Sequence, residues 1–246
     1  MDELEGVTVV DCGFDEHAQV VVVNYRDYPV KWSGPFTICF EDSEDDPLPP
    51  CMPLLNLFPK YEASESIRLI KKLVDGFLDV DAEIAELFEQ INWQQHLPAA
   101  VATVLSPRRV KAIPALWNAF DHGSWVMPQL AAVAYLVDPD FEANATGRVT
   151  NLCAVNSPRG LSSFDDHRLR GPANDLQRSA KGINALLALC ATKPGLRDWH
   201  EKTISTEAVA DLSARDIDGS ASIAIDWVEG LLAEFESLGI TVSRPD

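Results

Sequence analysis

Three short apolar segments in the middle of the chain share one pattern, which constrains the fold more than any other feature. Each has a proline near its start, apolar residues at three- and four-residue spacing, and a breaker at its end. A proline is tolerated in the first turn of a helix because the N–H that it lacks has no helical partner there. The segments begin at Leu97, Ile113 and Met127. They predict consecutive antiparallel helices joined by short connections, as in an α-solenoid.

Helical periodicity predicts further helices on both sides of this central part. The first follows Ser64 or Ser66, either of which can cap it, and Asp81 can cap the second. We expect the first helix to bury six apolar residues: Ile67, Ile70, Leu73, Val74, Phe77 and Leu78. Towards the C-terminus the same periodicity predicts four more helices, over residues 173–192, 195–203, 206–213 and 220–238.

The first forty residues have a different pattern, which predicts β structure. Val7–Val10 and Gln19–Tyr25 are rich in β-branched residues, and the polar residues 13–17 between them can form a turn. Phe36–Phe40 is a third candidate strand after a Ser-Gly-Pro breaker. These runs predict a small antiparallel sheet, which is marginal by itself and so is expected to pack on the helices.

Prolines separate this β-containing part from the helices. Five of them lie between Pro47 and Pro59, where they exclude a regular helix and favour an extended connector. We therefore expect two parts: residues 1–60 as a small β-containing segment, and residues 61–246 as a mainly α-helical, antiparallel helical array.

The chain is strongly acidic, with a formal net charge of −18. Residues 1–90 carry 20 acidic and 6 basic side chains, so the charge is concentrated near the N-terminus. An acidic surface repels nucleic acid and anionic membranes, and it attracts basic partners. The charge therefore predicts a protein partner with a basic surface, and neither a nucleic acid nor a membrane.

The same sequence favours a cytoplasmic location. Its longest apolar runs, such as Val20–Val23 and Leu130–Val137, are far shorter than a membrane span. The first residues, Met-Asp-Glu-Leu-Glu, have neither the positive charge nor the apolar stretch of a signal peptide. The five cysteines are an odd number, and no two are closer than twelve residues: Cys12, Cys39, Cys51, Cys153 and Cys190. This spacing fits neither a disulfide framework nor a CxxC site, so we interpret them as structural residues.

The central segments also resemble a known kind of protein. Ile113–Phe141, with the sequence IPALWNAFDHGSWVMPQLAAVAYLVDPDF, looks like HEAT-type helical repeats. In particular it resembles the short HEAT-like arrays among bacterial immunity proteins of polymorphic-toxin systems. The resemblance covers at most Asn92–Leu152, and it implies a scaffold that binds protein, with no catalytic residues.

No motif in the sequence declares a catalytic chemistry. It contains no GxSxG, GxxxxGK[ST], GxGxxG, HxH or HxxxH pattern. The strongest enzymatic alternative is a hydrolase with a site in the polar segment 154–172, where Asp165 and Asp166 precede His167. A polar loop explains that triplet more simply. We therefore expect a non-catalytic chain with no metal and no cofactor, and a general adaptor remains a third alternative.

The favoured hypothesis is an immunity protein that binds and neutralises a cognate toxin. Toxins that attack nucleic acids often have basic clefts, which an acidic protein can occlude through complementary charge and rapid association. Trp125 follows a Gly-Ser turn and is expected to be partly exposed, as a binding hot spot would be. The predicted partner-binding residues are Asp42, Glu44, Asp45, Asp46, Asp75, Asp79, Glu83, Glu86 and Trp125.

Overall fold

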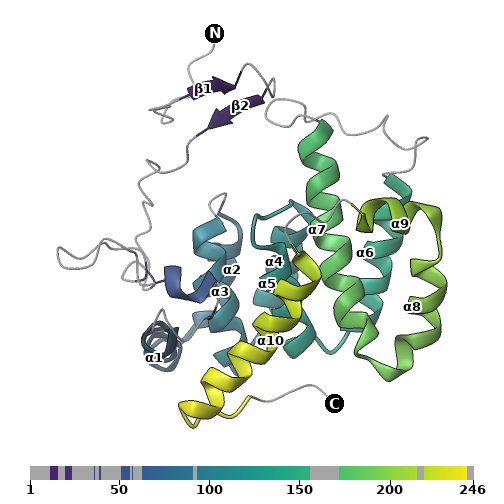
Figure 1. Cartoon of the computed structure of the whole chain (residues 1–246). Coiled ribbons are helices and arrows are strands. Elements are labelled where there is room, and N and C mark those ends of the chain that lie inside the picture. Colours follow the sequence, from purple (N-terminus) through teal and green to yellow (C-terminus); the bar gives the residue numbers. More distant parts are fainter. Residues whose placement is uncertain are drawn as a thin grey trace. The chain divides into compact units, whose positions relative to one another are not determined.

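The protein is described from a computed structural model, shown in Figure 1. The structure describes residues 12–15, 20–23, 36, 39, 51–55, 57, 63–90, 93–155, 172–214 and 219–242. The chain divides into two compact units, Met1–Ser33 and Gly34–Asp246.

The first unit contains two short strands. β1 (Cys12–Asp15) pairs antiparallel with β2 (Val20–Val23), and Gly13 lies opposite Val22 in this register. β2 lies within the predicted run 19–25, whereas Gly13–Asp15 form a strand where we predicted a turn. The weak strand preference of Gly13 and Asp15 is overridden by pairing with a run of four valines. The candidate strand Val7–Val10 lies outside the described residues.

The proline-rich region corrects two further predictions. Phe36 and Cys39 have 3-10 helical geometry, so the strand predicted over 36–40 is wrong at both positions. Met52–Leu55 forms the 3-10 helix η3, where we predicted an extended connector. Pro53 is the second residue of η3, where a missing N–H costs nothing, and the buried Leu54 anchors the turn in the second unit.

The second unit is a mainly α-helical array. Its α-helices in the described part of the chain are α1 (Ala63–Gly76), α2 (Val80–Phe88), α3 (Trp93–Leu105), α4 (Ala112–Asp121), α5 (Met127–Val137), α6 (Phe141–Val155), α7 (Pro172–Ala191), α8 (Arg197–Ile204), α9 (Glu207–Ser213) and α10 (Ser220–Ser237). The short 3-10 helix η5 (Pro194–Leu196) precedes α8. Each helix predicted from periodicity is present, with ends that differ by a few residues.

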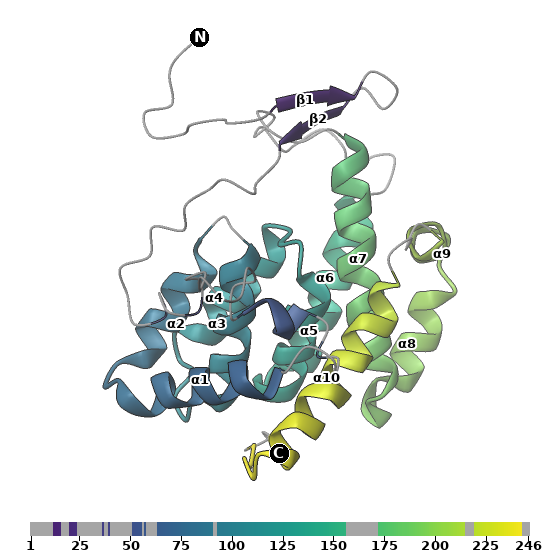
Figure 2. The ribbon, with the colours of Figure 1, turned by 60° about the vertical axis from the view of Figure 1, so that its left-hand side comes forward.

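The helices stack so that a few of them form the centre of the unit. α2 packs on α3 and α4, α3 packs on α5, and α5 packs on α7 and α10. Figures 1 and 2 show α10 running alongside α5 and α7, with α1 to α4 on one side of it and α6, α8 and α9 on the other. α5 is apolar on nearly all sides, and ten of its eleven residues are buried. A helix without a polar face is stable only when neighbours surround it.

Two of the three prolines lie near the start of a helix, as predicted. Pro114 and Pro128 are in the first turns of α4 and α5. Pro98 is instead in the interior of α3, which begins five residues earlier, at Trp93. Its ring removes one helical hydrogen bond, a cost of about 3 kcal/mol in an exposed helix. Ten of the thirteen residues of α3 are buried, and this packing offsets the cost.

The segment around η3 is held on the helices by specific contacts. Nε1 of Trp227 in α10 donates to the carbonyl of Leu54 at 2.9 Å, and Nε2 of Gln129 in α5 donates to that of Leu55 at 3.0 Å. Gly230 lets the chain approach closely, since a Cβ there would lie 3.3 Å from Cβ of Leu57. None of the helices in the described part of the chain is long and apolar enough to cross a membrane.

Candidate protein-binding surface

The turn between α1 and α2 exposes apolar side chains that we predicted to be buried. Phe77 and Leu78 are 45% and 95% exposed, because α1 ends at Gly76 before its apolar face is complete. Val110, in the turn between α3 and α4, is 82% exposed. The signal that identifies this ending is the Gly76 break followed three residues later by Asp79, a residue typical of a helix start.

These two turns are joined by hydrogen bonds. The carboxylate of Asp81, in the first turn of α2, accepts from the backbone N–H groups of Lys111 and Ala112 at 2.9 and 3.0 Å. Asp81 therefore caps α4 across the interface, and not its own helix as predicted. Nζ of Lys111 also lies 3.5 Å from Oδ2 of Asp79. Leu78 and Val110 are the chain neighbours of this ion pair, so the apolar side chains share one end of the α2–α4 layer.

Carboxylates lie next to the exposed apolar residues in the chain. The surface formed by Phe77, Leu78 and Val110 with the neighbouring Asp75 and Asp79 is named the Leu78 corner, and Glu83 and Glu86 follow it along α2. Asp75 is bound by Nζ of Lys71 at 2.5 and 2.7 Å. Burial raises the pKa of Glu83, and the neighbouring charges of Glu86 and Asp79 raise it further. The corner and α2 beside it therefore carry crowded negative charge that a cation would relieve.

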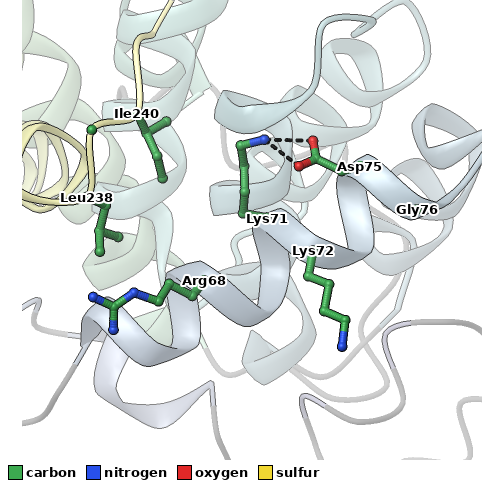
Figure 3. A pocket seen from close by; sticks show the side chains of 8 residues that line it. Arg68, Lys71, Lys72, Asp75, Gly76, Leu238 and Ile240 are labelled. Carbon is green, nitrogen blue, oxygen red and sulfur yellow. Dashed lines mark hydrogen bonds and ion pairs between the residues drawn. The ribbon is translucent and has the colours of Figure 1, made fainter.

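A shallow groove lies next to the corner, between α1 and the residues that follow α10 (Figure 3). Its volume is about 590 Å³, and α1 contributes Arg68, Lys71 and Lys72 together with Asp75. Leu238 and Ile240 form its apolar side. The Lys71–Asp75 ion pair neutralises one of the three cations. The groove thus places positive charge beside an acidic surface. A partner that covers both would contact charges of both signs.

Trp125 lies at the other end of the α2–α4 layer. It follows α4 and is 54% exposed, which confirms the predicted exposure. Its ring packs on that of Trp93, with centroids 4.8 Å apart, and Nζ of Lys181 lies 5.3 Å from its centroid. The ten residues of α4 separate it from Lys111 by about 15 Å. The structure therefore does not bring Trp125 together with the predicted acidic residues.

A buried histidine holds this second end together. Nδ1 of His96 lies 2.7 Å from the hydroxyl of Ser124, and Nε2 lies 2.9 Å from the carbonyl of Gln90. A carbonyl only accepts, so Nε2–H is the donor, and the neutral ring accepts from Ser124 through Nδ1. Burial lowers the pKa of His96, although its hydrogen bonds oppose the shift. The ring is therefore a neutral structural link and not a free base.

Several predicted residues are not brought into a site. Asp42, Glu44, Asp45 and Asp46 lie outside the described residues, as does the Asp165–His167 triplet. Among the described residues, no group of three histidines, cysteines or acidic residues is placed to hold a metal ion. Asp75 and Asp79 flank the exposed Phe77 and Leu78 in the chain, whereas Glu83 and Glu86 follow along α2, and the carbonyl of Glu86 accepts from Gln90 just after the end of that helix.

Comparison with known proteins leaves this surface as the main source of functional information. The sequence matches no protein-family model and no curated protein, and the structure matches no solved structure. The function is therefore inferred from the chemistry of the chain's own residues.

Proposed function

We propose that this chain is a non-catalytic protein-binding protein that docks a basic partner on the Leu78 corner. The observation that supports this most is the exposure of Leu78 and Val110, together with Phe77, next to Asp79 and its ion pair with Lys111. Binding energy at protein interfaces is concentrated in a few apolar residues that a polar rim shields from water. The corner supplies both kinds of residue, with exposed apolar side chains and neighbouring carboxylates.

The charge of the chain supports a basic partner. A net charge of −18 attracts basic proteins over a distance and speeds their association. At the corner and along α2 the crowded carboxylates Asp79, Glu83 and Glu86 repel one another. A lysine or arginine of the partner placed among them replaces this repulsion by attraction. We also propose that α2 to α5 form a HEAT-like array, since their alternating two-layer packing presents the helix-connecting turns as a surface.

The finer proposal is that the partner is a toxin that this chain neutralises, as an immunity protein does. An acidic surface with exposed apolar side chains is suited to cover the basic cleft of an enzyme that acts on nucleic acid. To neutralise such a toxin, this chain only has to bind it and cover its active-site cleft. No catalytic group on this chain is required.

The first test is affinity purification of the full chain from extracts of its own cells, with wild type and Leu78→Ser compared by quantitative mass spectrometry. We expect one partner to be recovered at a constant ratio with wild type and at least about tenfold less with Leu78→Ser, as for loss of a hot-spot residue. Ile204→Ser is the matched control, because Ile204 is 44% exposed on α8, away from the corner. Equal recovery with Leu78→Ser and wild type would exclude the corner as the interface.

A second test separates the toxin proposal from a general adaptor. The recovered partner is expressed alone and then together with this chain. We expect the partner alone to stop growth, and co-expression with wild type but not with Leu78→Ser to restore it. A partner that is harmless alone contradicts the toxin proposal and leaves the binding proposal in place.

A further inference from the structure

Two cysteines that are distant in the sequence lie side by side in the second unit. The backbone N–H of Cys51 donates to the carbonyl of Cys39 at 3.2 Å. Both side chains are buried, each with 1% of its surface exposed. Burial raises the pKa of each thiol to about 12, and for Cys39 the nearby Cys51 adds to the shift. The two sulfur atoms therefore share one buried environment as free thiols.

The backbone geometry of this pair suits a covalent link. A backbone N–H···O=C hydrogen bond keeps the two Cα atoms within about 7 Å, because each Cα is at most two covalent bonds from the bonded N or O atom. Disulfides have Cα atoms roughly 4.4–6.8 Å apart, so the hydrogen-bonded pair lies close to the range that a disulfide spans. The neighbouring turn is held by other contacts, since η3 is bound through Leu54 and Leu55 to α10 and α5. Cys51 directly precedes η3, so these contacts with the helical core fix its position.

We propose that Cys39 and Cys51 are a disulfide-forming pair, which a low-molecular-weight disulfide such as oxidised glutathione oxidises within the folded chain. One cysteine thiolate attacks a sulfur of oxidised glutathione, and one glutathione leaves as a thiol. The second cysteine thiolate then attacks the mixed disulfide, forms the Cys39–Cys51 bond and releases the second glutathione. Two protein thiols are oxidised, one glutathione disulfide is reduced, and the two protein protons end on the two glutathione thiols.

The link has a defined consequence for the chain. Residues 40–50 lie between the two cysteines and contain five acidic residues and three prolines. The disulfide turns this acidic segment into a closed loop whose two ends stay together even when the helices open.

The test uses the full chain in mixtures of reduced and oxidised glutathione, approached from both the reduced and the oxidised side. Buried thiols of high pKa exchange slowly, so equilibrium must be shown from both sides. Free thiols are then alkylated, and the chain is cut after lysine and arginine. Both cysteines fall in one peptide, residues 32–60. We expect this peptide to lose two hydrogens and take up no alkyl group, while a further cut after Glu41 and Glu44 leaves its ends joined until reduction.

Three cysteine variants, and the same chain unfolded in urea, serve as controls for this test. In Cys190→Ser, which removes another buried cysteine, the peptide should oxidise as in wild type, whereas Cys39→Ser and Cys51→Ser should each keep the remaining thiol free. We expect the equilibrium constant for the disulfide to be at least about tenfold larger in the folded chain than in urea, because the fold raises the effective concentration of the pair. An equal or smaller constant in the folded chain, or glutathione held stably on one cysteine, overturns the proposal.

Discussion

The two ends of the α2–α4 layer expose large side chains for different reasons. At the Leu78 corner, Leu78 and Val110 are mostly exposed and lie beside like charges that repel one another. At the other end, Trp125 is half exposed, but Trp93 covers one part of it and Lys181 lies over its ring. Next to Trp125 in the chain, Ser124 binds the buried His96, which also binds the carbonyl of Gln90, so His96 joins three segments.

Exposure alone does not identify a binding residue. A side chain that already has an aromatic and a cationic neighbour gains less from a partner than one that is exposed to water next to repelling carboxylates. The end around His96 should therefore be important for stability, whereas the Leu78 corner should be important for association and nearly neutral for stability.

Replacement of His96 by alanine should have the largest effect on stability. It leaves buried partners unsatisfied at Ser124 and Gln90 and creates a cavity, so we expect a loss of about 2–4 kcal/mol in the free energy of unfolding. Urea denaturation at pH 7.5 measures this loss. Leu78→Ala is the control, with an expected change within about 0.5 kcal/mol. A small effect of His96→Ala would show that this end is not a structural link.

The same histidine makes a pH prediction. The pKa of His96 is lowered in the folded state from an ordinary value of 6.5. The unfolded chain therefore binds the proton first, so this stability is complete above pH 6.5 and decreases as pH falls towards the lower folded pKa, by up to about 1.4 kcal/mol per pH unit. His96→Gln cannot titrate, and the difference in stability between it and wild type should change over this pH range only. A constant difference contradicts the lowered pKa.

Asp81 should have an intermediate effect, and it links the two turns of the corner. Asp81→Ala removes the acceptor of two backbone N–H groups, at Lys111 and Ala112, and should cost about 1–2 kcal/mol in unfolding free energy. Asp79→Ala removes only an exposed ion pair at 3.5 Å and should change stability by less than about 0.5 kcal/mol. Parallel urea titrations of the two variants compare them. Equal costs would show that Asp81 acts through its charge and not as a cap.

Trp125 should contribute to stability through its aromatic pair. We expect Trp125→Ala to cost about 1 kcal/mol, because it removes the ring contact with Trp93 and the cation contact with Lys181. Trp125→Phe keeps an aromatic ring there and should recover most of this loss. If Trp125→Ala instead leaves stability unchanged but abolishes partner recovery, the two ends exchange roles and Trp125 is the hot spot.

The helices could be predicted from the sequence because their burial pattern is local. Apolar spacing of three and four residues predicted helices where α1 to α5 and α7 to α10 lie, whereas no helix was predicted over α6, whose sequence is more polar. The failures arise where local and tertiary preferences compete. Pro98 suggested a helix start, but burial of α3 on its neighbours outweighs the hydrogen bond that the proline removes.

The candidate site was predictable only in part. The sequence alone shows that acidic residues are concentrated in residues 1–90. This concentration of charge indicated Asp75, Asp79, Glu83 and Glu86 as candidate binding residues. Phe77 and Leu78 continue the apolar periodicity of α1, so the sequence suggested burial, and only the ending of that helix at Gly76 exposes them. The pairing of Cys39 with Cys51 is a long-range contact, which a spacing of twelve residues does not reveal.

Glu83→Gln should have the smallest effect on the free energy of unfolding. Unlike the other substitutions, it should stabilise the chain. Glu83 is four residues after Asp79 and three before Glu86, and like charges at these helical spacings cost about 0.2–0.5 kcal/mol per pair. Glu83→Gln should therefore stabilise the free chain at neutral pH by a few tenths of a kcal/mol. Glu201→Gln, at an exposed position in α8, is the control and should give no gain.

The raised pKa of Glu83 fixes how this gain depends on pH. In the folded chain the carboxyl takes up its proton at a higher pH than the ordinary value of 4.5 in the unfolded chain. Wild type therefore regains stability relative to Glu83→Gln as pH falls through the raised pKa, and below pH 4.5 the two should coincide. Urea titrations between pH 7 and pH 4 follow the difference. If Glu83→Gln also slows association with a basic partner, the repulsion that destabilises the free chain is the same charge that recruits the partner.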